Sequence, residues 1–353
     1  MVAAALGVVG LLMTYAAFQR FQLDAGDAAR RKMTKELEGL RQAASAVFDE
    51  MKTLDLQIAQ LKSVVEAAEQ VQLRDQLQRL EDSRQRMATR YDGYVEELGT
   101  YRKLNDNEKV VYKMARVFNE SEFGMPAGFV NSVRDSIQNY WQGPAGRRRF
   151  AQAVQLAQRE GYVSLIVKTM QEHGLPAQFF YLALQESDFN IKAVGPPTRW
   201  GRAKGMWQFI PTTALRYWLD AGPYADNKTV DPQDERHDLE KSTEAAARYL
   251  QTICSTLAQA SGLLVIASYN WGEHRIVDKL EELPGPQTIP QEALEGIPED
   301  PTSRNYWRFL GEYADRMPKE TKDYVLKVFS AAVIGENPQQ FGFDFDNPLA
   351  PYM

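Results

Sequence analysis

The segment from Leu37 to Val65 carries the pattern that most restricts how this chain can fold. Its apolar residues recur in alternating steps of three and four, without a proline, and charged and amide side chains fill many positions between them. Such a heptad seam is typical of a coiled coil, because its apolar stripe cannot be buried by one isolated helix. The seam consists of Leu37, Leu40, Ala44, Val47, Met51, Leu54, Ile58, Leu61 and Val65.

The seam does not identify the helix that covers it. After Val65 the phase slips, so the helix is either interrupted or folds back as a hairpin. Two interpretations stay open: parallel self-association, most simply as a dimer, and packing against a helix of the same chain. The apolar series resumes as Leu73, Leu77, Leu80, Met87, Tyr91, Tyr94 and Leu98.

Residues 1–18 are uncharged and mostly apolar, which matches the lower end of the length that crosses a bilayer. No Lys or Arg precedes Arg20 and no small-residue cleavage site is clear, so we expect an uncleaved anchor over residues 1–23. Arg20, Arg30, Arg31 and Lys32 follow the apolar run of residues 1–18, and the positive-inside rule would place them in the cytoplasm. The membrane orientation therefore stays open, and one hypothesis is that a basic segment precedes Met1.

The composition narrows the classes of function. With 44% hydrophobic and 25% charged residues the chain can build a sizeable core, so a disordered class is excluded. A net charge of -6 argues against a nucleic-acid binder, and the basic run from Arg147 to Arg149 is expected to be a solvated helix face. The single cysteine, Cys254, cannot form an internal disulfide, and the three histidines lack the spacing of a zinc site. We expect no metal and no cofactor.

From Asn105 onward the pattern is one of short amphipathic helices separated by Gly and Pro, which predicts an all-α domain. A proline-rich loop is expected over residues 283–302. The predicted organisation is an anchor (1–23), a coiled coil (24–104), a helical region (105–174), the domain that bears the sequence motifs (175–340) and a C-terminal tail (341–353).

The segment from Leu175 to Asn190 predicts one buried acid. It is a strongly apolar helix whose first carboxylate, Glu186, comes only near its end. Burial disfavours the charged form, so we expect this carboxyl to have a raised pKa and to stay protonated near neutrality, as a general acid requires. Asp188 lies two residues on and on a different face. From these residues alone a structural role for Glu186, in an ion pair or as a cap of a neighbouring helix, is equally open.

Five short motifs occur in order between Leu175 and Val325. They are Leu175-Pro176 with Glu186-Ser187; the run from Gly205 to Ala214; Asp234, Arg236 and Asp238 with Ser242-Thr243; Tyr269-Asn270 with Gly272; and Pro318, Glu320, Thr321, Tyr324 and Val325. In this order they resemble the lytic transglycosylase family, which implies an all-α, lysozyme-like catalytic domain. Two departures concern the sugar groove: the link from Val194 to Lys204 is longer than usual, and Trp271 replaces a small residue.

The resemblance implies a peptidoglycan-cleaving enzyme with a single catalytic acid. Glu186 would protonate the glycosidic oxygen between N-acetylmuramic acid and N-acetylglucosamine, while the substrate's acetamido group stabilises the oxocarbenium-like centre. The same carboxylate would then deprotonate the C6 hydroxyl of the muramic residue, which attacks C1 and leaves a 1,6-anhydro end. Ordinary glycosidases use two carboxylates, whereas one suffices in this scheme.

The resemblance also implies roles for the residues around Glu186. Tyr324 is expected to hydrogen-bond Glu186 and to help orient it. Taken singly, each of the other residues is more often a packing or hydrogen-bonding residue than a ligand of substrate. The residues expected to line the sugar sites are Ser187, Met206, Gln208, Tyr269 and Asn270, together with Tyr324.

Two further sets of residues are assigned more weakly. Trp200 and Trp207 could either stack on sugar rings or fill the core, and we expect Trp207 in the core. The cluster of Asp234, Arg236 and Asp238 is interpreted as an ion-paired loop staple, because an adjacent arginine favours ionised carboxylates, the opposite of what an acid catalyst needs.

Three functions remain distinguishable. The first is a lytic transglycosylase anchored in the bacterial inner membrane, with its catalytic domain in the periplasm or cell-wall space and peptidoglycan glycan strands as its partner. The second is a non-catalytic peptidoglycan-binding scaffold of an envelope machine, against which the retained Glu186 speaks. The third is a lysozyme-type hydrolase, which would need a further acid to activate water. Whether cleavage is endo or exo stays open.

Overall fold

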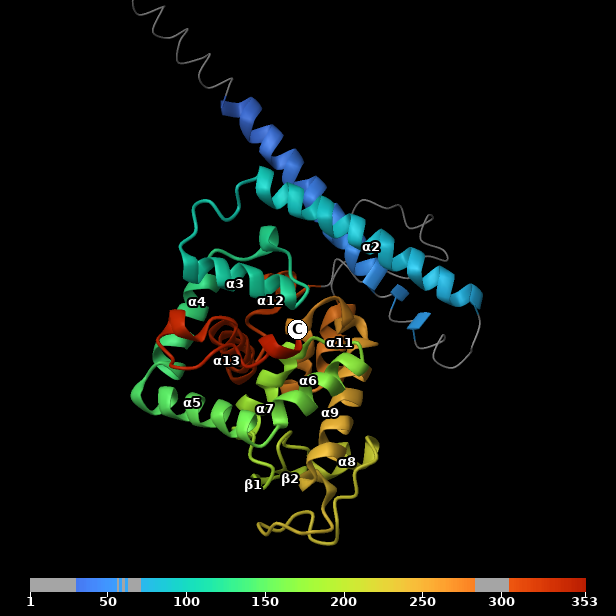
Figure 1. Cartoon of the computed structure of the whole chain (residues 1–353), viewed down its shortest axis with the longest axis vertical. Coiled ribbons are helices and arrows are strands. Elements are labelled where there is room, and N and C mark those ends of the chain that lie inside the picture. The colour runs from blue at the N-terminus through green and yellow to red at the C-terminus, as the bar shows by residue number, and fades with distance from the viewer. Residues whose placement is uncertain (1–29, 56, 59–60, 63–70, 283–304) are drawn as a thin grey trace, which may run out of the picture.

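The computed structural model describes residues 30–55, 57–58, 61–62, 71–282 and 305–353. Figure 1 shows two parts, a long pair of helices and, beside it, a helical domain whose far end carries a small β-hairpin. The helix-rich architecture agrees with the predicted all-α class. The anchor and the proline-rich loop that the sequence predicts lie outside the described residues. Within the described part of the chain, every helix is too short or too polar to cross a membrane.

The first pair of helices is an antiparallel hairpin formed by residues 30–55 and α2 (Val71–Glu97). The ring of Phe48 lies 4.9 Å from that of Tyr91, and Asp55 pairs with Arg84 at 2.9 Å. The central seam residues are thereby buried within one chain, as the second interpretation of the heptad pattern predicted. The buried hairpin core consists of Ala44, Val47, Phe48 and Met51 against Ala88, Tyr91 and Val95.

The hairpin is attached to the domain through a buried carboxylate. Glu122 accepts hydrogen bonds from the hydroxyl groups of Tyr91 and of Tyr101, the latter at 2.9 Å. Asp92 of α2 pairs with Arg116 of α3 (Asp106–Val117) at 2.5 Å. Because phenolic donors and an ion pair join the two parts, the hairpin is packed onto the domain rather than separated from it by a free linker.

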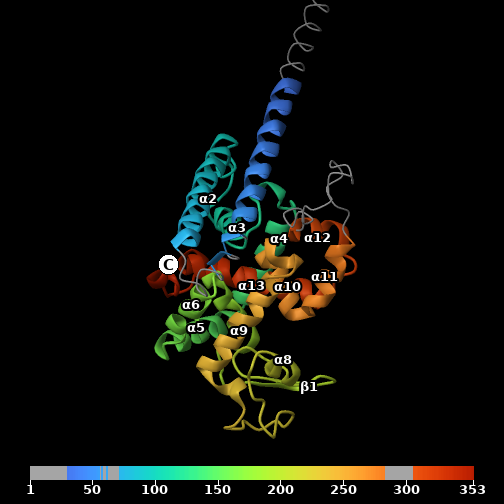
Figure 2. The same cartoon turned by 90° about the vertical axis from the view of Figure 1, so that its right-hand side faces the viewer.

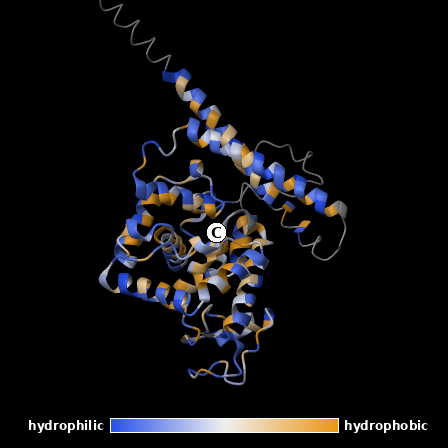
Figure 3. Cartoon of the chain, viewed as in Figure 1, coloured by the Kyte–Doolittle hydropathy of each residue, from blue (hydrophilic) through white to orange (hydrophobic). Residues whose placement is uncertain are grey.

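The domain is built around α13, whose residues are buried on nearly all sides. This helix packs against α3, α4, α7 and α10, so the motif that it carries is brought beside the earlier ones (Figure 2). Figure 3 shows hydrophilic residues alternating with hydrophobic ones along α3 and α5, as expected of helices at the edge of a core. The helices are α3 (Asp106–Val117), α4 (Phe129–Ser136), α5 (Pro144–Arg159), α6 (Tyr162–Glu172), α7 (Phe180–Ser187), α8 (Pro211–Arg216), α9 (Leu239–Cys254), α10 (Gly262–Trp271), α11 (Glu273–Glu281), α12 (Tyr306–Tyr313) and α13 (Lys319–Glu336).

A two-stranded antiparallel sheet interrupts this helical pattern. It consists of β1 (Val194–Thr198) and β2 (Gly201–Lys204), with Val194 opposite Lys204 and Thr198 opposite Gly201. The longer link noted in the sequence is therefore a β-hairpin, which the all-α prediction did not include. Two prolines on β1 conceal it, because proline is unfavourable in most strands.

Candidate active site

Glu186 lies in the last turn of α7, which ends abruptly. Residues 180–184 are buried, and their apolar side chains fix the helix in the core. The next two residues after Ser187, Asp188 and Phe189, both have left-handed backbones, with φ of 56° and 61°. Two consecutive non-glycine residues in this region cannot continue a right-handed helix, so Glu186 is presented at a helix end.

The carboxyl of Glu186 is held by a neighbouring tyrosine. The residue is half-buried, and its Oε1 accepts a hydrogen bond from the hydroxyl of Tyr324 at 2.5 Å. Desolvation raises the pKa of Glu186 to about 7, although the hydrogen bond from Tyr324 acts in the opposite direction. A carboxyl of this kind is protonated in a large fraction of molecules at neutral pH, which suits a general acid.

Three helices converge on this carboxyl. Tyr324 and Thr321 come from α13, and Thr321 donates to Oδ1 of Asn270 on α10 at 2.9 Å. The hydroxyl of Tyr269, also on α10, donates to the backbone oxygen of Trp207 at 2.8 Å. Burial, followed by the charge of Glu186, raises the pKa of Tyr269 and of Tyr324 well above the ordinary value, so both hydroxyls remain donors.

The second motif forms the adjoining wall. Ser187 donates to the backbone oxygen of Met206 at 2.7 Å, and the side chain of Met206 is fully buried beneath the site. Gln208 is half-buried with a left-handed φ of 51°, and its amide donates to the backbone oxygen of Gly205 at 2.8 Å. Trp207 is fully buried and donates to Thr243 at 3.1 Å, which confirms the prediction that it belongs to the core.

The charged cluster after the β-hairpin forms the predicted staple between Asp234 and Arg236, but Asp238 is not part of it. Arg236 is fully buried and donates to both oxygens of Asp234, at 2.8 and 2.7 Å. Burial would raise the pKa of Asp234, but its hydrogen bonds with Arg236 and the buried Lys204 lower it. Asp238 instead caps α9 by accepting from the amide of Lys241. The burial of Lys204 was not predicted, since a buried lysine has no local signature in the sequence.

Gly205 shows why the second motif begins with glycine. Its φ is 79°, and a Cβ at this position would lie 1.7 Å from the backbone oxygen of Arg236. Only glycine accommodates both the backbone conformation and the close approach. The staple and the wall of the site are therefore in direct contact.

A tyrosine next to the site was also missed. The ring of Tyr249 lies 5.2 Å from that of Tyr269, and its hydroxyl donates to Glu273 at 3.0 Å. Glu273 also pairs with Arg216 at 2.9 Å. Tyr249 falls on the buried face of α9, so the periodicity of that helix predicts its burial but does not reveal its neighbour.

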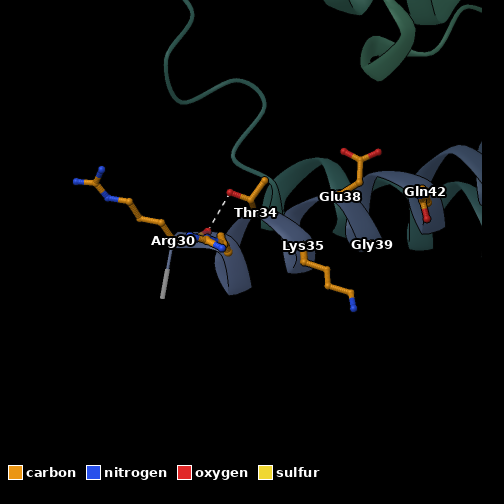
Figure 4. Close-up of a pocket in the computed structure, with 7 residues that line it drawn as sticks. Arg30, Thr34, Lys35, Glu38, Gly39 and Gln42 are labelled. Atoms are coloured by element: carbon orange, nitrogen blue, oxygen red, sulfur yellow. Dashed lines mark hydrogen bonds between the residues drawn. The ribbon is translucent and has the colours of Figure 1, made fainter. Parts of the chain in front are cut away.

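Other parts of the described chain offer less. No group of three or more His, Cys, Asp or Glu residues within the described ranges is placed to hold a metal ion. A shallow depression on the first helix, shown in Figure 4, is lined by residues between Arg30 and Gln42. It contains no residue of the five motifs, so the convergence around Glu186 remains the candidate site.

Residues 164–288 match the family described as Transglycosylase SLT domain. This segment is an SLT transglycosylase domain. It includes Glu186, the wall from Gly205 and the α10 residues Tyr269 and Asn270. The matched range ends before α13 and does not include Tyr324. The packing of α13 brings Tyr324 to the site.

Two curated relatives carry a closely related name. The chain is 26% identical over 228 residues to "Membrane-bound lytic murein transglycosylase D" of Escherichia coli strain K12, and equally to the protein of that name from strain O6:H1. These alignments cover 65% of this chain and 42% of the relatives, so the chain spans less than half of their length. A "Putative tributyltin chloride resistance protein" of an Alteromonas species is 27% identical over 127 residues, 36% of this chain and 55% of that protein.

Proposed function

We propose that this protein is a peptidoglycan lytic transglycosylase that cleaves between N-acetylmuramic acid and N-acetylglucosamine with Glu186 as its single catalytic acid. The observation that carries the proposal is the state of that carboxyl, half-buried at a helix end with a pKa raised to about 7 and a phenolic donor on Oε1. The SLT domain and the relatives named as murein transglycosylases support the same substrate class.

The chemistry follows from the two protonation states of Glu186. Its protonated form donates to the glycosidic oxygen as the bond to C1 breaks, which leaves positive charge on the sugar ring. The resulting carboxylate then removes the proton from the C6 hydroxyl, whose oxygen bonds to C1 to form the 1,6-anhydro product. Glu186 is protonated again at the end, and no water is consumed. Tyr324 keeps Oε1 in one position throughout, so the other oxygen faces the substrate.

The hydrolase alternative would require a second carboxylate facing Glu186. Hydrolysis with inversion or through a covalent intermediate requires a second carboxylate across the scissile bond. Asp188 is two residues away, but it is paired with Arg149 at 2.6 Å.

Placement in the envelope is a second part of the proposal. We infer that residues 1–23 anchor the chain in the inner membrane with the SLT domain on the cell-wall side, which is consistent with relatives named as membrane-bound. Self-association through the heptad seam stays a hypothesis, because α2 already covers the centre of that seam.

The decisive experiment is mass spectrometry of the products formed from purified peptidoglycan by the full chain. We expect muropeptides with 1,6-anhydro ends, 18 Da lighter than hydrolysis products because one water is not added. Reducing ends would support the hydrolase instead. The absence of soluble products, with retained binding to peptidoglycan, would support the non-catalytic scaffold.

A further inference from the structure

Arg149 departs from the solvated helix face that the basic run predicted. Its neighbours Arg147 and Arg148 are exposed, but Arg149 on α5 is half-buried. Its Nε donates to Oδ1 of Asp188 at 2.6 Å, and Nη1 donates to the hydroxyl of Tyr140 at 2.5 Å. The guanidinium also lies 5.4 Å from the ring of Trp141. The prediction was therefore wrong for this one member of the run.

The first partner of Arg149 belongs to the strained turn that ends α7. Asp188 is the C-cap of the helix, two residues after Glu186, and has a left-handed backbone. Phe189 follows in the same region and is buried, with its ring 4.4 Å from that of Phe180. Such conformations persist only where surrounding contacts hold them, and they concentrate at functional sites.

The second partner reaches the other side of Glu186. Tyr140 lies in a π-helical turn, η2 (Ile137–Trp141), a local irregularity that is frequent at functional sites. Its hydroxyl donates to Oε1 of Gln185 at 3.4 Å, a long contact to the residue that precedes Glu186. Arg149 thus contacts both flanks of the acid, directly through Asp188 and through Tyr140 to Gln185.

The same cluster extends to the helix that carries Tyr324. Lys327, one turn further along α13, places its ammonium 4.3 Å from the centre of the Tyr140 ring. The indole of Trp141 donates to the backbone oxygen of Lys327 at 3.1 Å. The helix that carries Tyr324 and the segment that carries Glu186 therefore contact the same group of side chains.

We propose that Arg149 is a positioning residue, which fixes the turn after Glu186 and thereby aims its carboxyl at Tyr324 and at the substrate. This proposal rests on the proposed function of Glu186. Arg149 has no contact with the Glu186 carboxyl, so it acts through Asp188 and Tyr140. Arginine suits the role better than lysine, because its planar group donates in fixed, separate directions and stacks on aromatic rings.

The test compares Arg149→Ala, Arg149→Lys and Asp188→Asn with a matched control, Arg148→Ala, in the full chain. Arg148 is the exposed neighbour in the same run, so its replacement removes equal charge without touching the turn. For Arg149→Ala we expect kcat on purified peptidoglycan to fall roughly tenfold to a hundredfold, as small misplacements of reacting groups do, with KM changed less than about twofold. Arg149→Lys should recover only part of that loss, and Arg148→Ala should match wild type.

A second readout does not need turnover. Carbon-13 NMR titration of the Glu186 carboxyl should show a shifted midpoint in Arg149→Ala and in Asp188→Asn, because the turn that encloses the carboxyl is loosened and its charges are no longer paired. If Arg149→Ala only lowers the melting temperature, with the titration and the kcat of the folded enzyme unchanged, the pair is merely structural and the proposal is overturned. If Arg149→Ala does not fold, Asp188→Asn and Arg149→Lys decide by the same criteria. If wild type cleaves no peptidoglycan, the proposed function fails, while the titration still decides whether Arg149 positions Glu186.

Discussion

At the scale of single residues, Glu186 combines two requirements that oppose each other. Under the proposed function its carboxyl must be buried enough to hold a proton near pH 7 and open enough to reach a sugar, and a half-buried residue at the end of α7 is consistent with both. Glu186→Gln removes the proton donor and keeps the volume. We expect peptidoglycan cleavage to fall about a hundredfold to ten-thousandfold, with the circular dichroism spectrum and glycan binding retained. Activity within about tenfold of wild type would exclude Glu186 as the acid.

A substitution of Tyr324, the hydrogen-bond donor to Glu186, tests the same carboxyl. The hydroxyl favours the ionised form of Glu186 and lowers its pKa, so Tyr324→Phe should raise that pKa above its value of about 7. We expect the pH-rate profile of cleavage to move to higher pH and its maximum to fall. The reason is that a smaller fraction of Glu186 is ionised for the step in which it acts as a base. A profile that keeps its position would mean that the hydrogen bond does not form in solution.

At the scale of elements, Glu120 joins four parts of the chain. It is fully buried, accepts from the Ser261 hydroxyl that caps α10 and from the amide of Tyr306 at the start of α12, and lies near the buried Lys52 of the hairpin. Burial raises its pKa to about 7, and Lys52 acts in the opposite direction. Between about pH 4.5 and pH 7, Glu120 therefore holds a proton in the folded state that it has already lost in the unfolded chain.

This retained proton gives a pH dependence of stability with a definite sign. Because the folded pKa exceeds the unfolded one, the contribution of Glu120 is complete below about pH 4.5 and declines as the pH rises to about 7. Glu120→Gln should remove this slope, at most ~1.4 kcal/mol per pH unit. Urea unfolding of both proteins at pH 5, 6 and 7 measures it. Parallel pH dependences of the two proteins would show that Glu120 is ionised in the folded protein.

The packing of the helical hairpin predicts the oligomeric state of the protein. Since Ala88 and Tyr91 of α2 cover the centre of the heptad seam, residues 30–353 should sediment as a monomer. Met51→Asp should lower the melting temperature without changing the mass, because it places a charge in this buried contact. A wild-type dimer that Met51→Asp dissociates would show instead that the seam opens to pair with a second copy.

At the scale of the whole molecule, the hairpin and the site are separate in sequence but joined by contact. Deletion of residues 1–104 removes Tyr91 and Tyr101, both donors to the buried Glu122, yet leaves all five motifs in place. We expect the shortened chain to cleave peptidoglycan and to melt at a lower temperature, because Glu122 loses its partners. A shortened chain that is folded by circular dichroism but inactive would show that the hairpin contributes to the groove.

The sequence by itself determined the features that depend on nearby residues. Helical periodicity predicted the seam and the helix-rich domain, the apolar run before Glu186 predicted its raised pKa, and the five motifs predicted the family of the SLT domain. These features could be read because helix faces and caps repeat over three or four residues, and because an acid at the end of a strongly apolar helix is carried toward the core with that helix.

Only the tertiary structure decided which distant segments meet. Tyr324 lies 138 residues beyond Glu186, and the resemblance alone had suggested their hydrogen bond. Likewise α2 covers the seam, Lys204 is buried against Asp234, and Arg149 turns from the expected solvated face toward Asp188. The physical reason is common to all four cases. A local pattern shows that a side chain needs a partner, but the partner is selected by how distant segments of the chain pack against one another.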